Sequence, residues 1–185
     1  PIVGKEQVMK GRELHWLHWG LIPSWARDPA MGSRLINARS ETVADKPSFR
    51  AAFKRRRCLV LADGFYEWKQ LASKQKQPYL IRMRDGSPFG IAGLWERWKD
   101  PDGQVVESCT LLTTRPNELL APIHDRMPVI LHPDDHDTWL DPDNHDSRSL
   151  EALLKPCPAD VLEAFAVTTR VNSPRQDDPA CIEPL

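Results

Sequence analysis

Short apolar runs alternate with turn residues through the middle of the chain, which is the pattern of a strand-rich domain. Runs of β-branched, aromatic and aliphatic residues predict strands at residues 14–22, 58–62, 65–68, 79–83, 89–95, 109–114, 128–131 and 165–171. Asp63-Gly64 is a dipeptide typical of tight turns. It predicts an antiparallel hairpin made of the strands at residues 58–62 and 65–68.

Helical spacing is confined to short segments. Phe49, Ala52 and Phe53 recur at helical spacing behind Ser48, which is a suitable N-cap. Capping or acidic residues also begin predicted helices at residues 117–121, 134–140 and 147–154. Strands joined by turns, with helices inserted between them, predict an α+β domain: a curved, mainly antiparallel, barrel-like sheet with short peripheral helices.

Composition places the chain among globular proteins. Its 185 residues suffice for one well-buried core, so a single domain over residues 1–185 is expected. No apolar segment reaches the roughly 18 residues of a membrane span, no signal peptide is visible, and the four cysteines are scattered. We therefore expect a cytoplasmic protein that does not bind membranes. A net charge of −1 argues against a polycation but leaves room for a local basic patch.

Glu67 is the first candidate for chemistry, because it stands between Tyr66 and Trp68 just after the predicted turn. A carboxylate held among aromatic rings has its pKa raised by desolvation, which suits a general acid. Strand alternation also allows the opposite arrangement, in which the two aromatic residues face the core and Glu67 faces solvent. The pattern leaves both arrangements open.

Two further segments carry polar groups suited to catalysis or binding. His124 lies in a proline-rich loop, where Asp125 or Arg126 could orient the ring or a substrate. Asn37 and Arg39 offer a neutral amide and a guanidinium, a combination suited to placing a nucleophile and binding a phosphate. Each of these residues also has an ordinary role available as a turn, cap or ion-pair residue.

The histidines form no recognisable metal motif. His132 and His136 share helical spacing, and His15 lies close to His18, but no third ligand stands at a typical distance in the sequence. Glycine-rich phosphate loops and Gly-x-Ser-x-Gly elbows are also missing from the sequence. We expect no metal and no cofactor.

Five motifs taken together resemble one family. They are Trp-Gly-Leu-Ile-Pro-Ser-Trp at 19–25, Leu-Ile-Asn-Ala-Arg-Ser-Glu at 35–41, Ala-Asp-Gly-Phe-Tyr-Glu-Trp-Lys at 62–69, Ala-Gly-Leu-Trp at 92–95 and Ile-His-Asp-Arg-Met-Pro at 123–128. In this order and spacing they resemble the SOS response-associated peptidase family, whose members process abasic sites and crosslink themselves to single-stranded DNA. The resemblance continues to Thr-Arg-Val-Asn-Ser-Pro at 169–174 and to the closing Ile-Glu-Pro-Leu.

The resemblance implies a specific chemistry. In the family, removal of the initiator methionine leaves an N-terminal cysteine, whose amine and thiol capture the aldehyde of an abasic site as a thiazolidine. By resemblance, Asn37 orients the terminal amine, Glu67 shuttles protons, and His124 protonates the sugar oxygen as the ring opens.

The resemblance also implies DNA contacts. Arg39 matches a phosphate contact, Thr113 falls near the lesion, and Trp25 packs against an exposed base. Some relatives carry a further tryptophan at the position of Ala26, so one stacking surface is expected to be missing. The implied partner is single-stranded DNA with abasic sites, bound by a monomer.

The start of the chain departs from the family pattern. Family members begin Met-Cys-Gly-Arg, whereas this sequence starts at Pro1, so we expect that the segment bearing the nucleophile is missing. The autopeptidase and crosslinking activities are then expected only of a full-length protein. These 185 residues are expected to bind DNA without forming a covalent adduct. Two alternatives stay open: a non-covalent single-stranded DNA-binding module that uses Trp25, Arg39 and the basic cluster 55–57, and an unrelated hydrolase that uses Glu67 and His124.

Overall fold

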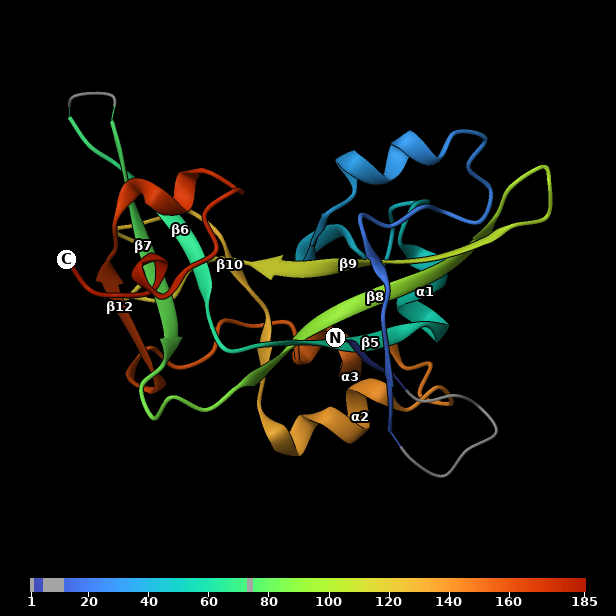
Figure 1. Ribbon diagram of the computed structural model, residues 1–185. Coiled ribbons are helices and arrows are strands. Elements are labelled where there is room, and N and C mark those ends of the chain that lie inside the picture. The colour runs from blue at the N-terminus through green and yellow to red at the C-terminus, as the bar shows by residue number, and fades with distance from the viewer. Residues whose placement is uncertain (1, 5–11, 73–74) are drawn as a thin grey trace. The chain divides into compact units, whose positions relative to one another are not determined.

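The computed structural model describes residues 2–4, 12–72 and 75–185, which form two compact units (Figure 1). The first unit comprises Pro1–Leu61, Gly90–Thr114 and Pro128–Lys155, and the second comprises Ala62–Phe89, Arg115–Met127 and Pro156–Leu185. Because the chain passes between the units several times, neither unit is a continuous stretch of sequence.

A mainly antiparallel sheet forms the framework of the first unit. Its long central pair is a hairpin of β8 (Phe89–Lys99) and β9 (Val105–Thr114), in which Lys99 lies opposite Val105. β3 (His18–Trp19) and β4 (Asn37–Arg39) run parallel to β9. The remaining strands are β5 (Arg57–Ala62), β1 (Ile2–Gly4) and β2 (Glu13–His15), which continue the sheet beyond β8, together with the short β10 (Met127–Pro128) and β11 (Ile130–Leu131).

Short helices bury their apolar residues against one face of this sheet. They are α1 (Arg50–Arg55), α2 (His136–Leu140) and α3 (Ser147–Ala152). The 3-10 helices η1 (Pro29–Arg34), η2 (Ser40–Thr42) and η3 (Pro133–Asp135) also belong to this unit. Phe53 of α1 and Trp139 of α2 pack in one core with strand residues such as Leu94 and Leu112. The buried indole of Trp139 donates to the carbonyl oxygen of Cys58 at 2.8 Å, so its polar atom is satisfied.

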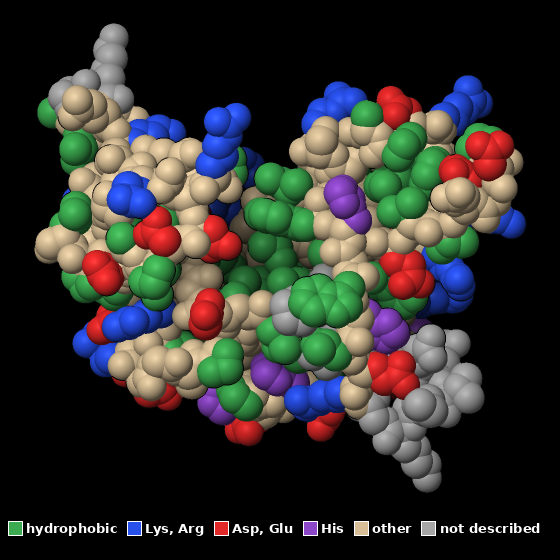
Figure 2. Space-filling view, viewed as in Figure 1, with side chains coloured by type: hydrophobic (Ala, Val, Ile, Leu, Met, Phe, Trp, Pro, Cys, Tyr) green, Lys and Arg blue, Asp and Glu red, His purple; other side chains and the backbone are tan. Residues whose placement is uncertain are grey.

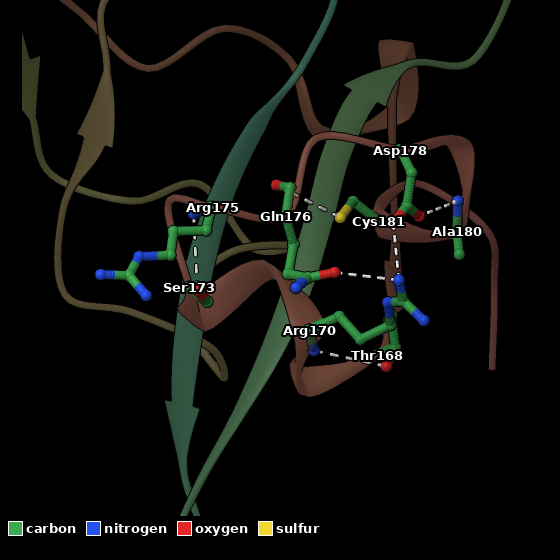
Figure 3. Close-up of polar contacts among 8 residues, drawn as sticks. All are labelled: Thr168, Arg170, Ser173, Arg175, Gln176, Asp178, Ala180 and Cys181. Atoms are coloured by element: carbon green, nitrogen blue, oxygen red, sulfur yellow. Dashed lines mark hydrogen bonds and ion pairs between the residues drawn. The ribbon is translucent and has the colours of Figure 1, made fainter.

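The second unit is a small antiparallel sheet in the order β12-β7-β6. Its strands are β12 (Leu162–Ala166), β7 (Lys76–Met83) and β6 (Phe65–Gln70), and its 3-10 helices are η4 (Ala159–Val161), η5 (Thr169–Asn172) and η6 (Pro179–Cys181). Polar contacts order the C-terminal segment (Figure 3), where Arg170 donates to Gln176 at 2.9 Å and to Asp178 at 2.6 Å.

The expected class is confirmed: the fold is α+β, with mostly antiparallel strands and short helices. The helices predicted around residues 134–140 and 147–154 are present. Among the described residues, no helix has both the length and the apolar composition needed to span a bilayer.

The predicted hairpin at Asp63-Gly64 is wrong. β6 pairs with β7, whereas β5 pairs with β1 in the other sheet. Gly64 lies so close to β7 that an added Cβ would stand 3.1 Å from the carbonyl oxygen of Ile81. The turn therefore leads the chain from one sheet to the next. The β8–β9 hairpin has its turn at Gly103, whose φ of +89° favours glycine.

Three local predictions also need correction. The strand predicted at residues 14–22 is divided, since β2 ends at His15 and β3 covers only His18–Trp19. Beyond β3, the amide of Ile22 donates to the side chain of Ser108 at 2.9 Å. Phe49, not Ser48, occupies the N-cap position of α1. The strand predicted at 165–171 ends at Ala166, because Thr168 caps the 3-10 helix that follows.

Candidate functional site

A glutamate–histidine pair gives the second unit a site with acid–base character. Glu67 lies on β6, and His124 lies in the segment 117–126, which forms hydrogen-bonded turns in place of the predicted helix at 117–121. The Oε2 atom of Glu67 is 3.6 Å from Nδ1 of His124. The structure thus brings together two residues that the sequence presented as separate candidates.

Strand alternation separates Glu67 from its aromatic neighbours. The hydroxyl of Tyr66 donates to the carbonyl oxygen of Cys181 at 3.2 Å, and the indole of Trp68 donates to Oδ1 of Asn172 at 2.7 Å. Both aromatic rings therefore face the C-terminal segment. Glu67 points to the opposite face, where it meets His124 and keeps only 20% of its side-chain surface exposed. The face of β6 that carries Glu67 is therefore largely covered and not open to solvent.

This environment perturbs the acidity of Glu67. Burial raises the pKa of its carboxyl above the ordinary value, the positive charge of His124 opposes that shift, and the negative charge of Asp125 adds to it. The backbone N–H of Trp68 also lowers the pKa by hydrogen bonding to the carboxylate. Because burial is the largest of these causes, the protonated form of Glu67 persists to higher pH than in an exposed glutamate.

Asn117 holds the turns that present His124. Its side-chain oxygen accepts from the amide of Leu120 at 3.0 Å, and its side-chain nitrogen donates to the carbonyl of Cys157 at 3.1 Å. The carbonyl of Leu120 in turn accepts from the amide of His124 at 2.9 Å. Asn117 itself is 6% exposed. From the sequence, Asn117 is recognisable only as a helix start, since nothing local to it indicates burial.

Asn37, Arg39 and Thr113 lie on one face of the sheet in the first unit. The parallel register places Asn37 beside Leu111 and Arg39 beside Thr113, and paired residues of neighbouring strands share a face. Between them, Ala38 points to the opposite face and is buried in the core. Asn37 and Arg39 are both exposed. This face can therefore offer an amide and a guanidinium to a ligand.

Aromatic surface is also available in the first unit. Trp25 is 56% exposed, on a loop that the indole of Trp98 anchors by donating to the carbonyl of Ala26 at 2.7 Å. Ala26 is buried beside Trp98. The sequence pattern does not mark Trp19 as a binding residue, yet it pairs with Cys109 on the same face as Asn37, and it is 55% exposed.

The basic cluster 55–57 is only partly available to a ligand. Arg57 is 4% exposed and donates to backbone carbonyls of the first unit. Arg56 forms an ion pair with the buried Glu96 at 2.6 Å, which leaves Arg55 as the exposed member. On the face shown in Figure 2, acidic and basic side chains are interspersed. A non-covalent DNA-binding module could therefore not use Arg57 as one of its phosphate contacts.

The cysteines and histidines offer little other chemistry. All four cysteines are buried, and burial raises the pKa of Cys109 and of Cys157 to about 11, so these thiols are poor nucleophiles at neutral pH. His132 caps η3 through the amide of Asp134. Within the described residues, no group of three or more His, Cys, Asp and Glu side chains is placed to hold a metal ion.

In this α+β protein, the second unit holds a partly buried glutamate beside a histidine, and the first unit exposes amide, guanidinium and aromatic groups. These are the kinds of group that proteins use for acid–base chemistry and for binding polar ligands. The SOS response associated peptidase (SRAP) family matches residues 1–174, so the match runs through both units. The chain belongs to this family.

Relatives and solved structures agree with this membership. The abasic site processing protein YoqW of Bacillus subtilis (strain 168) is 48% identical over 167 residues, which cover 90% of this chain and 75% of that protein. The abasic site processing protein HMCES of Gallus gallus is 35% identical, over 94% of this chain and 58% of that protein. An X-ray structure of a protein from Bacteroides thetaiotaomicron matches with a TM-score of 0.91 and 30% identity, covering 100% of this chain and 80% of the other.

Proposed function

We propose that this protein processes abasic sites in single-stranded DNA and that Glu67 and His124 are its proton-transfer pair. The observation that carries the proposal is the 3.6 Å approach of the Glu67 carboxylate to the His124 ring. A carboxyl with a raised pKa beside an imidazole is suited to donating and accepting protons near neutral pH. The description of YoqW and HMCES as abasic site processing proteins supports the same substrate.

The chemistry starts from the sugar. An abasic site is a cyclic hemiacetal in equilibrium with an open-chain aldehyde. As the ring opens, His124 donates a proton to the ring oxygen, and the hydroxyl on C1 of the sugar gives its proton to the carboxylate of Glu67. A primary amine then adds to the aldehyde carbon. Protonated Glu67 gives its proton to the resulting hydroxyl group, which leaves as water and yields an imine. Addition of a neighbouring thiol to the imine closes a thiazolidine, so the condensation releases one water molecule.

An N-terminal cysteine, exposed by removal of an initiator methionine, supplies both the amine and the thiol, and Glu67 assists that cleavage. An α-amino group with a pKa of about 8 is partly unprotonated at neutral pH and can attack an aldehyde. Covalent capture is therefore proposed for protein in which such a cysteine precedes these residues. Asn37 then orients the amine.

The proposed DNA contacts lie in the first unit. Arg39 binds a phosphate, Thr113 contacts the strand near the lesion, and Trp25 stacks on an exposed base. Their support is the shared face of Arg39 and Thr113 and the 56% exposure of Trp25.

Intact mass spectrometry tests the proposal. Protein carrying the N-terminal cysteine ahead of these residues is mixed with a single-stranded oligonucleotide that contains one abasic site. We expect a gain of one oligonucleotide mass less one water. The variants E67Q and H124Q should slow adduct formation by roughly 100-fold while keeping most of the DNA affinity. The matched control E183Q changes an exposed glutamate of the same unit and should leave the rate unchanged.

Two results would contradict the proposal. Adduct formation at the unaltered rate in both E67Q and H124Q would remove the assigned pair from the chemistry. DNA binding without any gain of mass would instead support a non-covalent single-stranded DNA-binding module.

A further inference from the structure

Four groups meet at a single nitrogen atom of His124. Nδ1 lies 3.6 Å from Oε2 of Glu67 and 3.4 Å from Oδ1 of Asp125. The backbone N–H of Arg126 donates to the same atom at 3.1 Å, and the carbonyl oxygen of Arg126 lies 3.2 Å away. Nδ1 carries either one lone pair or one hydrogen. The protonation state of the ring therefore decides which of these groups it can bind.

The neutral ring and the charged ring use different partners. When the N–H of Arg126 donates to Nδ1, the proton of the neutral ring must reside on Nε2. When the ring is charged, Nδ1 becomes a donor and turns to an acceptor, which is a carboxylate of Glu67 or Asp125 or the carbonyl of Arg126. Protonation of the ring thus removes the hydrogen bond from the N–H of Arg126 and allows Nδ1 to donate to Glu67, to Asp125 or to the carbonyl of Arg126.

The two carboxylates differ in their surroundings. The side chain of Asp125 is 87% exposed, whereas that of Glu67 is 20% exposed. Asp125 keeps its hydration while its negative charge lies against the ring. The cross-strand neighbour of Glu67 on β7 is the phenol Tyr79, and Tyr66 of its own strand points to the opposite face.

We propose that Asp125 is a positioning residue for the Glu67–His124 pair: its carboxylate holds the imidazole beside Glu67 and determines which of the two side chains carries the proton that they share. The inference rests on the proposed function for the use of that proton, but the location of the proton is a property of the second unit. The effect of Asp125 on Glu67 has the corresponding sign, since its charge raises the pKa of that carboxyl.

Carbon-detected NMR titration of the Glu67 carboxyl in the 185-residue chain tests the proposal without any reaction. E67Q identifies the signal. In D125N, the Glu67 titration should move to lower pH, because a negative charge that opposed ionisation has been removed. D125E retains a carboxylate and should keep the titration near that of the unaltered chain. D160N makes the same charge change at an exposed aspartate of the same unit and should have no effect.

The same variants in protein that carries the N-terminal cysteine give a kinetic readout. D125N should move the falling limb of the pH–rate profile for adduct formation to lower pH and reduce the rate near neutral pH by about 10-fold. An unchanged Glu67 titration in D125N, or one that moves equally in D125E, would overturn the proposal. If the unaltered protein forms no adduct, the proposed function fails, while the titration still decides the role of Asp125.

Discussion

Replacement of Arg57 by methionine should destabilise the first unit without weakening its contact with DNA. The guanidinium uses all of its N–H groups on backbone carbonyls: those of Phe53 and Lys54 at 2.8 Å, of Trp139 at 2.6 Å, of Asn144 at 3.1 Å, and of Asp141. This side chain therefore ties the end of α1 to the segment that follows α2. Burial also lowers the pKa of Arg57, which reflects the cost of removing its charge from water.

The magnitude follows from these bonds. At about 1 kcal/mol for each hydrogen bond, the loss would approach about 5 kcal/mol, and water that reaches the freed carbonyls recovers part of it. We expect the free energy of unfolding to fall by about 3–5 kcal/mol, a large share of the stability of an ordinary domain. Urea unfolding followed by circular dichroism measures the change. R57K keeps the charge but has fewer donors, so its loss should be intermediate.

A comparison with Arg55 separates structure from DNA binding. R55Q alters an exposed residue of the same cluster and should change the free energy of unfolding by less than about 0.5 kcal/mol. If Arg55 contacts a phosphate, R55Q lowers the salt dependence of single-stranded DNA binding by about 0.7 in log–log slope, whereas folded R57M retains the full slope. Two results for R57M would refute the reasoning: an unaltered free energy of unfolding, or a reduced salt dependence of single-stranded DNA binding.

Two further predictions concern the second unit. Because burial raises the pKa of Glu67, the folded state binds this proton more tightly than the unfolded state, and the resulting stability is present at low pH and lost as the pH rises through the raised pKa. E67Q should accordingly unfold at higher urea concentration than the unaltered chain at about pH 8 but not at about pH 4; an equal gap at both values would contradict this. Asn117→Ala removes the bonds to Leu120 and Cys157 and should cost about 2–3 kcal/mol in urea unfolding. Asn117→Asp would bury a carboxylate facing the carbonyl oxygen of Cys157 and should cost at least as much; unchanged stability in Asn117→Ala would argue against this account.

Much of the local architecture and the candidate chemistry could be predicted from the sequence. Apolar runs located most strands of both sheets, because the period of two and the content of β-branched and aromatic residues are local properties. For Glu67 the pattern left two arrangements open, and the structure has the one in which Tyr66 and Trp68 point away from it. Glu67 and His124 were recognisable as candidates because they stand among aromatic residues and prolines that limit their freedom.

Partner choice was decided only by the tertiary structure, since it depends on packing between residues far apart in the chain. The Asp63-Gly64 turn has local hairpin chemistry, yet the close fit of Gly64 against β7 directs the chain into another sheet. Arg57 belongs to a basic run that a solvent-exposed surface would also carry, and carbonyls from α2 and beyond account for its burial. Alternation allowed Glu67 an outward-facing position without requiring it, and in the structure the turns held by Asn117 cover that face with His124. Periodicity is a short-range property of the backbone, whereas desolvation and ion pairing depend on what the folded chain brings to each face.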